Sequence, residues 1–414
     1  MSEVRQQALK AKAAAPRLAL LGRTEKDTIL EGMAQALLRD TPALLQANET
    51  DLKAAQERGT SKAMMDRLRL SEERISAMAE GMRKVARLED PTSQVIGGWQ
   101  RPNGLRIEKR RVPLGVIGII YEARPNVTAD AIALCIKSGN ACVLRGGSEA
   151  IHSNIAIAQT LIQAGIACGL PDGAVQLIAD TSRASSTELM QLNGIVDVLI
   201  PRGGAGLIRS VVEHASVPVI ETGVGNCHIY VDESADLEMA ARIVVNAKCS
   251  RPSVCNAAEK LLIHQAIAPT FLPKINALLR DQHVVLRGNE QACRIDAHME
   301  PAQEEDWQTE YNDLILSVKI VADLEEALSH IARYSTHHSE AIVTENIANA
   351  ERFLNEVDAA AVYVNASTRF TDGEEFGFGA EIGISTQKLH ARGPMGLNEL
   401  TSMKYIVRGN GQIR

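Results

Sequence analysis

The chain has 414 residues, of which 45% are hydrophobic and only 3% aromatic, and its formal net charge is -7. This length exceeds what one small core requires and predicts two domains, or one large domain with an appendage. The acidic balance, with a pI near 5.9, argues against nucleic acid as a main partner, because binding to phosphate backbones needs a basic excess.

Residues 1–20 have a helical period but lack the apolar core and small-residue cleavage site of a secretory signal. The longest apolar run, residues 112–121, contains Pro113 and is too short to cross a bilayer. The cysteines form no C-x-x-C pair, so we expect neither a disulfide framework nor a metal site. These features predict a cytoplasmic protein without membrane or nucleic-acid partners.

The first half of the chain changes from a helical pattern to an alternating one. Apolar residues at spacings of three and four predict helices over residues 1–88. The strands expected next are 112–121, 141–145, 175–178 and 196–200, and the helices are 129–137, 152–168, 185–190 and 207–214. This alternation is typical of parallel sheets, which bind ligands at the carboxyl ends of their strands.

A second α/β region follows the glycine-bearing stretch 221–225, where we place a domain boundary. Its expected strands are 228–231, 260–264, 317–321 and 362–365, and its expected helices are 237–247, 268–280, 324–334 and 347–357. Strand-like extensions near both ends of this α/β body can pair with each other or with another subunit. The expected domains are therefore 1–104 with 112–222, then 223–385, with a flap of 105–111 and 400–414.

Cys255 is the expected nucleophile, and it lies in a polar, basic stretch before the strand at 260–264. Lys248 and Arg251 precede it closely, and cations favour the thiolate, which is the nucleophilic form of cysteine. Most of the other cysteines lie in apolar surroundings, as inert core residues do. The histidines that lack partners at ligand spacing, and are expected at the surface, are His337, His338 and His390.

Two strand ends carry an arginine with glycines. The first group is Arg145, Gly146, Gly147 and Ser148, and the second is Pro201, Arg202, Gly203 and Gly204. Glycines let backbone N–H groups approach a ligand, and the second loop leads into a helix N-terminus, which attracts anions. Either loop alone can be a tight turn, but together they favour a phosphate-bearing cofactor. The arginines favour NADP over NAD, which usually meets an acidic residue.

Two further loops supply cations and amides. Arg124 can clamp a carboxylate or phosphate, and Asn126 can donate its amide to an oxyanion; the alternative is a surface arginine and a helix cap. Thr368 and Arg369 follow the last expected strand and can hold a small anionic substrate.

With these loops in place, the chain resembles the aldehyde dehydrogenase superfamily, and within it the gamma-glutamyl phosphate reductases. The motifs are RVPLGVIG at 111–118, YEARPNV at 121–127, IPRGGAGL at 200–207, RPSVCN at 251–256, YVNASTRF at 363–370 and LHARGPMG at 389–396. The resemblance implies an α/β protein with a Rossmann-like, parallel-sheet NADP-binding domain, a thiol-bearing α/β catalytic domain and a small oligomerisation flap. It therefore also implies a homo-oligomer.

The resemblance assigns roles to several residues. Cys255 matches the catalytic cysteine, Arg145 stands where relatives carry the lysine that meets the cofactor ribose, and residues 202–204 match the cofactor loop. Glu310 is the nearest candidate for the acidic residue that binds the nicotinamide ribose. Glu221 stands near the position of a water-activating glutamate, and its role here is either that or structural.

The activity implied is the NADPH-dependent reduction of L-glutamyl 5-phosphate to L-glutamate 5-semialdehyde and phosphate, in proline biosynthesis, through a thioacyl enzyme on Cys255. Arg124, Arg251 and Arg369 are expected to bind the phosphate and the α-carboxylate, in an order left open. Two alternatives remain: a hydrolytic NAD(P)-dependent aldehyde dehydrogenase that uses Glu221, and a non-catalytic, nucleotide-sensing subunit. Transient contact with glutamate 5-kinase is expected on chemical grounds, because the acyl phosphate is unstable.

Overall fold

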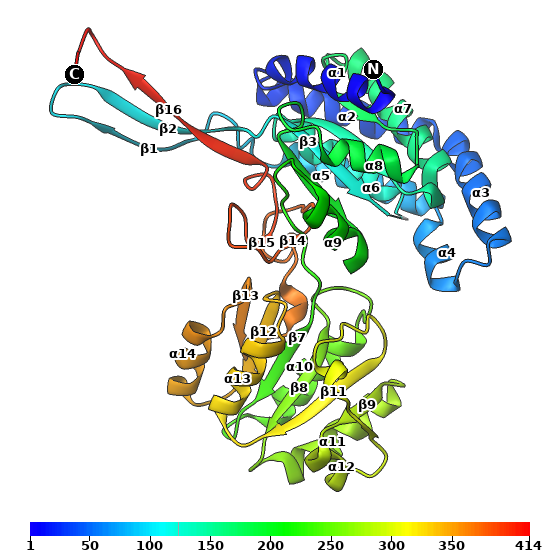
Figure 1. The fold of residues 1–414 in the computed structure, drawn as a ribbon, viewed down its shortest axis with the longest axis vertical. Helices are drawn as coiled ribbons and strands as arrows, with labels where there is room; N and C mark the ends of the chain where they lie inside the picture. Colours follow the sequence, from blue (N-terminus) through cyan, green and yellow to red (C-terminus); the bar gives the residue numbers. More distant parts are fainter. Residues whose placement is uncertain (123) are drawn as a thin grey trace. The chain divides into compact units, whose positions relative to one another are not determined.

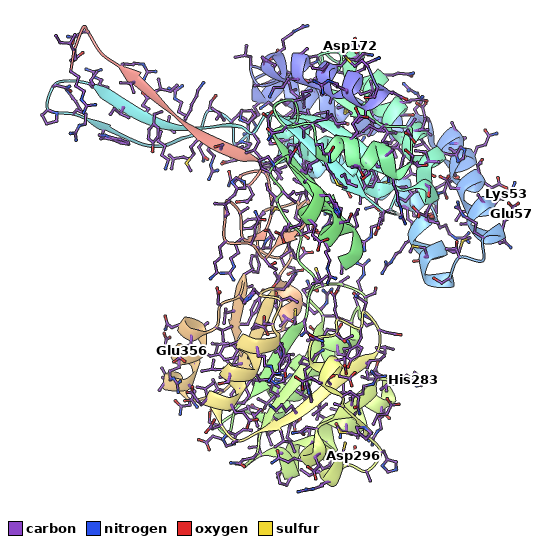
Figure 2. All side chains as sticks on the ribbon, in the orientation of Figure 1. Lys53, Glu57, Asp172, His283, Asp296 and Glu356 are labelled. Atoms are coloured by element: carbon purple, nitrogen blue, oxygen red, sulfur yellow. The ribbon has the colours of Figure 1, made fainter. Side chains whose placement is uncertain are left out.

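The computed structural model describes residues 1–122 and 124–414, without the side chains of residues 62 and 63 (Figure 1). These residues form two compact units. Unit 1 is Met1–Thr222, Gly377–Gly383 and Met395–Arg414, and unit 2 is Gly223–Phe376 and Ile384–Pro394. Figure 2 shows outward-pointing charges such as those of Lys53 and Glu57. Within the described ranges, no helix is both long and apolar enough to span a membrane.

Unit 1 begins with five helices, as the periodicity predicts. They are α1 (Glu3–Leu18), α2 (Arg23–Arg39), α3 (Thr41–Glu57), α4 (Lys62–Leu68) and α5 (Glu72–Arg87). Serine side chains cap several of them; Ser2 and Ser71 accept hydrogen bonds from backbone N–H groups in the first turns of α1 and α5. Their buried faces consist largely of Ala, Leu, Ile and Met, which compensates for the scarcity of aromatic residues.

A four-stranded parallel sheet forms the centre of unit 1, with the strand order β5-β4-β3-β6. Its strands are β3 (Val116–Tyr121), β4 (Ala141–Gly146), β5 (Val175–Leu177) and β6 (Val198–Arg202), and the helices after α5 are α6 (Asn126–Lys137), α7 (Ile151–Ala167), α8 (Arg183–Met190) and α9 (Ala205–His214). α1, α8 and α9 share one hydrophobic cluster with β3 and β4. Because the strands are parallel, the loops after β3, β4 and β6 emerge at one edge.

Three antiparallel strands form the flap: β1 (Val95–Gln100), β2 (Arg106–Pro113) and β16 (Thr401–Arg408). The two predicted extensions pair with each other, from Pro113 opposite Thr401 to Arg106 opposite Arg408. The expected strand at 112–121 is wrong at its start, because residues 112–113 belong to β2. Gly115 separates the two strands with a φ of +127°, a conformation that only glycine adopts readily.

Unit 2 contains seven parallel strands in the order β10-β9-β11-β8-β7-β12-β13. The strands are β7 (Cys227–Val231), β8 (Ala258–His264), β9 (Val285–Gly288), β10 (Glu300–Pro301), β11 (Ile315–Val321), β12 (Ser339–Val343) and β13 (Ala361–Val364). The helices are α10 (Leu237–Cys249), α11 (Ala268–Asp281), α12 (Glu290–Ile295), α13 (Leu324–Tyr334) and α14 (Ile347–Glu356). The short elements of unit 2 are η2 (Glu304–Trp307), η3 (Thr368–Phe370), β14 (Ile384–Ser385) and β15 (Gly393–Pro394), and unit 1 has the short element η1 (Ser148–Ala150).

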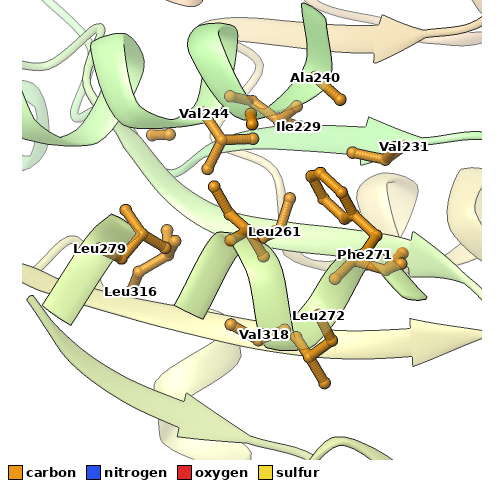
Figure 3. Packing of buried hydrophobic residues seen from close by; sticks show 14 of the residues in the cluster. Ile229, Val231, Ala240, Val244, Leu261, Phe271, Leu272, Leu279, Leu316 and Val318 are labelled. Atoms are coloured by element: carbon orange, nitrogen blue, oxygen red, sulfur yellow. The ribbon is translucent and has the colours of Figure 1, made fainter. Parts of the chain in front are cut away.

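Both faces of the unit 2 sheet are buried. Figure 3 shows one core, in which Ile229 and Leu261 from the strands meet Val244 and Phe271 from α10 and α11. A second cluster, with residues of α13 and α14, contains Tyr230 and other strand residues. Burial on both faces is typical of parallel sheets between helices, and it confirms the predicted α/β class.

Two further expectations need correction. His338 is not a surface histidine: it is fully buried immediately before β12, a strand that the sequence analysis missed. The second domain does not run continuously to residue 385, because Gly377–Gly383 belongs to unit 1. There, Ile382 and Gly383 exchange backbone hydrogen bonds with Met395, and these bonds hold the segment in place.

Candidate active site

Cys255 lies in the loop that connects α10 to β8, and it is half-buried. The backbone of this loop packs directly against Gly225, where a Cβ atom would overlap with the carbonyl group and the Cα atom of Cys255. From β7, the Cys227 thiol donates a hydrogen bond to the Cys255 carbonyl oxygen, at 3.2 Å. The nucleophile candidate is therefore held by contacts that the local motif does not reveal.

Gly225 also connects the thiol loop to Glu310, the residue predicted to bind the nicotinamide ribose. The Gly225 N–H donates to Glu310 Oε1 at 2.8 Å. Lys260 Nζ donates to the carbonyl oxygen of Thr309, at 2.7 Å, and so fixes the turn that carries Glu310. Glu310 and Cys255 thus both contact Gly225, which lies two residues before β7, within unit 2.

Lys248 does not support the thiolate in the way the sequence analysis expected. Its side chain is fully buried, and Nζ lies 2.9 Å from Glu259 Oε2. Burial lowers the pKa of Lys248, while the Glu259 carboxylate opposes that effect. Because Glu259 balances its charge in the core, Lys248 has a structural role below the Cys255 loop. Of the two cations that precede Cys255, only Arg251 is exposed.

The two predicted substrate-binding residues of η3, Thr368 and Arg369, differ in burial and in hydrogen bonding. Thr368 is fully buried, and its hydroxyl donates to the carbonyl oxygen of Asn256 at 2.7 Å, which does not favour a contact with substrate. Arg369 is half-buried, and its Nε donates to Ser250 Oγ at 3.1 Å, just before the thiol loop. Burial first, and the nearby Arg251 second, lower the pKa of Arg369. η3 therefore places a cation close to Cys255.

In unit 1, the loops after β3 and β6 meet through a residue that the sequence analysis did not single out. Glu122 Oε2 accepts a hydrogen bond of 2.9 Å from the N–H of Gly204, the N-cap residue of α9. A Cβ atom on Gly203 would contact the same carboxylate. The helix N-terminus predicted to attract a phosphate thus already carries an acidic partner; Pro201 is buried and Arg202 is half-buried beside it.

Around the carboxyl end of β4, several buried polar atoms of the described residues have no hydrogen-bond partner. Among the described residues these include Arg145 Nε, Glu149 Oε2 and Asn154 Nδ2. Arg145 Nη2 donates to the carbonyl oxygen of Ser182 at 2.9 Å, and burial lowers the pKa of Arg145. A Cβ atom on Gly146 would collide with Asn154, and one on Gly147 would collide with Glu149, whereas Ser148 is exposed.

These features fit a nicotinamide dinucleotide. Among the described residues, the unpartnered polar atoms near the end of β4 offer hydrogen bonds to a ligand. The carboxylates of Glu122 and Glu149 suit ribose hydroxyls, while the Arg145 guanidinium suits an anionic group.

The loop after β3 shows whether Asn126 caps the helix that follows it. The N-cap residue of α6 is Pro125, so the interpretation of Asn126 as a helix cap is wrong. Asn126 is exposed, and its Nδ2 donates to Asp130 Oδ2 at 3.0 Å. Burial raises the pKa of Asp130 to about 6. Arg124 is exposed and Glu221 is half-buried, while Ala123 of this motif lies outside the described residues.

Comparisons with known proteins agree with this arrangement. The sequence pattern of the aldehyde dehydrogenase family matches residues 1–315. The gamma-glutamyl phosphate reductase of Clostridium beijerinckii is 60% identical over 414 residues, which is 100% of both chains. A crystal structure of gamma-glutamyl phosphate reductase from Thermotoga maritima has 49% identity and a TM-score of 0.98, and the match covers 100% of both chains.

A more distant structure shows the shared fold alone. The acetylating aldehyde dehydrogenase from Geobacillus thermoglucosidasius is 19% identical and has a TM-score of 0.70; the match covers 100% of this chain and 97% of the other.

Proposed function

The chain belongs to the aldehyde dehydrogenase family, in its gamma-glutamyl phosphate reductase branch, and from this premise we propose that it reduces L-glutamyl 5-phosphate to L-glutamate 5-semialdehyde and phosphate. This is the second step of proline biosynthesis from glutamate. The observation that carries the proposal is the half-buried Cys255, which lies close to the cations of Arg251 and Arg369. The family and its fold imply a nicotinamide cofactor.

The proposed chemistry starts at Cys255. Its thiolate attacks the acyl carbon of the substrate: an S–C bond forms, the C–O bond to phosphate breaks, and phosphate leaves with the bonding electrons. When bound, the reduced nicotinamide supplies the hydride for the thioester carbon. The C–S bond then breaks, its electrons return to sulfur, and the semialdehyde leaves.

The other proposed roles follow from charge. Arg251 and Arg369 bind the phosphate and the α-carboxylate, and Arg124 stays a candidate for the same task. Backbone N–H groups near Cys255 stabilise the oxyanion, with Asn126 as a further donor. Thr368 no longer belongs to this set, because its hydroxyl supports the thiol loop.

For the cofactor, we propose NADPH. The residues proposed to hold it are Arg145, Gly146, Gly147, Ser148, Pro201, Arg202, Gly203 and Gly204 in unit 1, and Glu310 in unit 2. The flap strands are proposed to mediate homo-oligomerisation, and a transient contact with glutamate 5-kinase stays part of the proposal, as does a cytoplasmic location.

The test is NADP+ reduction with glutamate 5-semialdehyde, with and without inorganic phosphate, by the wild type and Cys255→Ala. We expect activity that requires phosphate and disappears in Cys255→Ala. Activity that ignores phosphate but falls in Glu221→Gln would support the hydrolytic aldehyde dehydrogenase instead. Stoichiometric labelling of Cys255 by iodoacetamide near neutral pH would contradict a non-catalytic subunit.

A further inference from the structure

Asn256 follows the nucleophile candidate directly, but its side chain does not face solvent. It is 4% exposed and turned onto η3, the segment that carries Arg369. No local pattern explains why an amide should be buried at this position. Its hydrogen bonds do.

The amide of Asn256 holds both the backbone and the side chain of η3. Nδ2 donates to the carbonyl oxygens of Arg369, at 3.2 Å, and Thr371, at 3.0 Å. Oδ1 accepts a hydrogen bond from Arg369 Nη1. Only a primary amide offers donors and an acceptor in this planar arrangement, because a carboxylate has no donor and a hydroxyl is too small to bridge the three groups.

These bonds fix the direction of the Arg369 guanidinium. Nη1 is bound by Asn256 and Nε by Ser250, so two separate points of the planar group are held. Because the guanidinium is rigid, its remaining nitrogen is fixed in direction as well. An arginine held in this way loses less conformational entropy when it binds an anion.

The surroundings favour an anion rather than a purely structural arginine. Arg369 is half-buried and lies close enough to Arg251 for the two positive charges to repel each other. An anion bound by both guanidinium groups would relieve this repulsion and would lie next to the loop of Cys255.

We propose that Asn256 is a positioning residue, which orients the Arg369 guanidinium so that an anionic group of the substrate binds beside the Cys255 thiol. The inference rests on the proposed acyl-phosphate reductase function and adds a residue to it. Asn256 does not touch the reacting atoms and acts only through Arg369. Removing either side chain should therefore cause the same defect.

The test compares two reagents that alkylate Cys255 with loss of iodide: anionic iodoacetate and neutral iodoacetamide. A fixed cation beside the thiol attracts the anionic reagent, so the ratio of the two rate constants reports the guanidinium without any turnover. In Asn256→Ala this ratio should fall at least about tenfold, as focused charge raises association rates by that order. Arg369→Ala should give the same fall, and the double variant should fall no further.

Thr368→Val is the matched control, because it removes another bond between η3 and Asn256 but leaves the Asn256 side chain intact. Its ratio should stay close to that of the wild type, because no charge beside the thiol moves. An unchanged ratio in Asn256→Ala, defects that multiply in the double variant, or an equal fall in Thr368→Val would each overturn the proposal. If Asn256→Ala lacks a cooperative unfolding transition, Asn256→Ser replaces it, because a hydroxyl is too small to hold the three groups, and an unchanged ratio there overturns the proposal too.

Kinetics then identify the anion. A higher KM for inorganic phosphate in Asn256→Ala places the phosphate on Arg369, whereas a higher KM for the semialdehyde places the α-carboxylate there. The KM for the cofactor should not change, and a change in that value alone would contradict the role. Because alkylation needs no catalysis, failure of the proposed function would leave the labelling result readable.

Discussion

Gly225 and Cys255 are in backbone contact, so close that a Cβ atom on Gly225 would overlap with the carbonyl group of Cys255. The N–H of the same glycine binds Glu310. The segment before β7 therefore sets the position of the nucleophile candidate and of an acidic residue proposed for the cofactor. Any side chain at position 225 must displace one of them.

Gly225→Ala should consequently lower both activity and stability. Forcing a methyl group into a packed site costs about 1–3 kcal/mol, and here the obstacle is backbone, which cannot rotate away. Urea unfolding and the steady-state kcat measure the two effects. Gly206→Ala is the control, because Gly206 lies in α9 and, apart from its chain neighbours and its own helix backbone, no described atom lies within 4 Å of the added Cβ; alanine also favours helix. Equal behaviour of the two variants would refute the steric argument.

The buried ion pair between Lys248 and Glu259 should be costly to break. Both side chains are almost fully buried, and Glu259 Oε1 also accepts a hydrogen bond from the Asn312 N–H. Lys248→Met removes the ion-pair partner of Glu259 and leaves the more weakly interacting Lys260 as the nearby cation, so the free energy of unfolding should fall by up to about 3–5 kcal/mol. Denaturant titration measures the loss. The double variant Lys248→Met with Glu259→Leu should recover part of the lost unfolding free energy. A double variant that is less stable than Lys248→Met alone would contradict the explanation.

Much of the fold was predictable, because buried parallel strands such as β3 and β8 are short apolar runs between helical patterns. β12 was missed because it begins with Ser339 and Glu340, which look like a polar loop. In the fold Glu340 is fully buried, and it accepts a hydrogen bond from the His228 N–H at 2.7 Å. A polar strand start of this kind can be recognised only once its partner strand is known.

The candidate active site likewise has a part that the sequence indicates and a part that only the structure shows. Cys255 and the glycine loops have local signatures, so the sequence alone indicates them. The contacts that position them join residues distant in the chain: Asn256 to Arg369 across 113 positions, and Glu122 to Gly204 across 82. Tertiary packing decides these contacts, and no spacing rule encodes them.

The buried His338 should make the protein sensitive to acid. Burial lowers the pKa of His338 to about 4, below the ordinary value of 6.5. Between these values the unfolded chain binds a proton that the folded chain does not, so stability is lost as the pH falls from 6.5 towards 4. The slope from one such group is at most about 1.4 kcal/mol per pH unit.

His338→Gln should flatten that slope in unfolding free energies measured at several pH values across the window. His390→Gln is the control, because His390 is exposed. If both variants keep the wild-type slope, burial of His338 does not govern the acid response.

The cofactor preference can be tested at Arg145. Arg145 is half-buried near the end of β4, and its Nη2 donates to the carbonyl oxygen of Ser182 at 2.9 Å, while its Nε has no hydrogen-bond partner among the described residues. If Arg145 meets the 2′-phosphate, Arg145→Gln removes a charge-assisted bond worth about 1.5–3 kcal/mol, or at least about tenfold in Kd. Binding of NADPH should therefore weaken by that factor, while binding of NADH changes much less.

Fluorescence titration of both cofactors measures this difference without turnover. Arg183→Gln is the matched control, since Arg183 begins α8, directly after the Ser182 carbonyl that Arg145 contacts, and is exposed. Removing its charge tests whether general electrostatics near the loop suffices to change affinity. Equal weakening of NADPH and NADH by Arg145→Gln would instead place this arginine on a part of the dinucleotide common to both, such as the ribose or the pyrophosphate. The 2′-phosphate preference would then have to come from another cation, and Arg202, at the end of β6 in the same sheet, is one candidate.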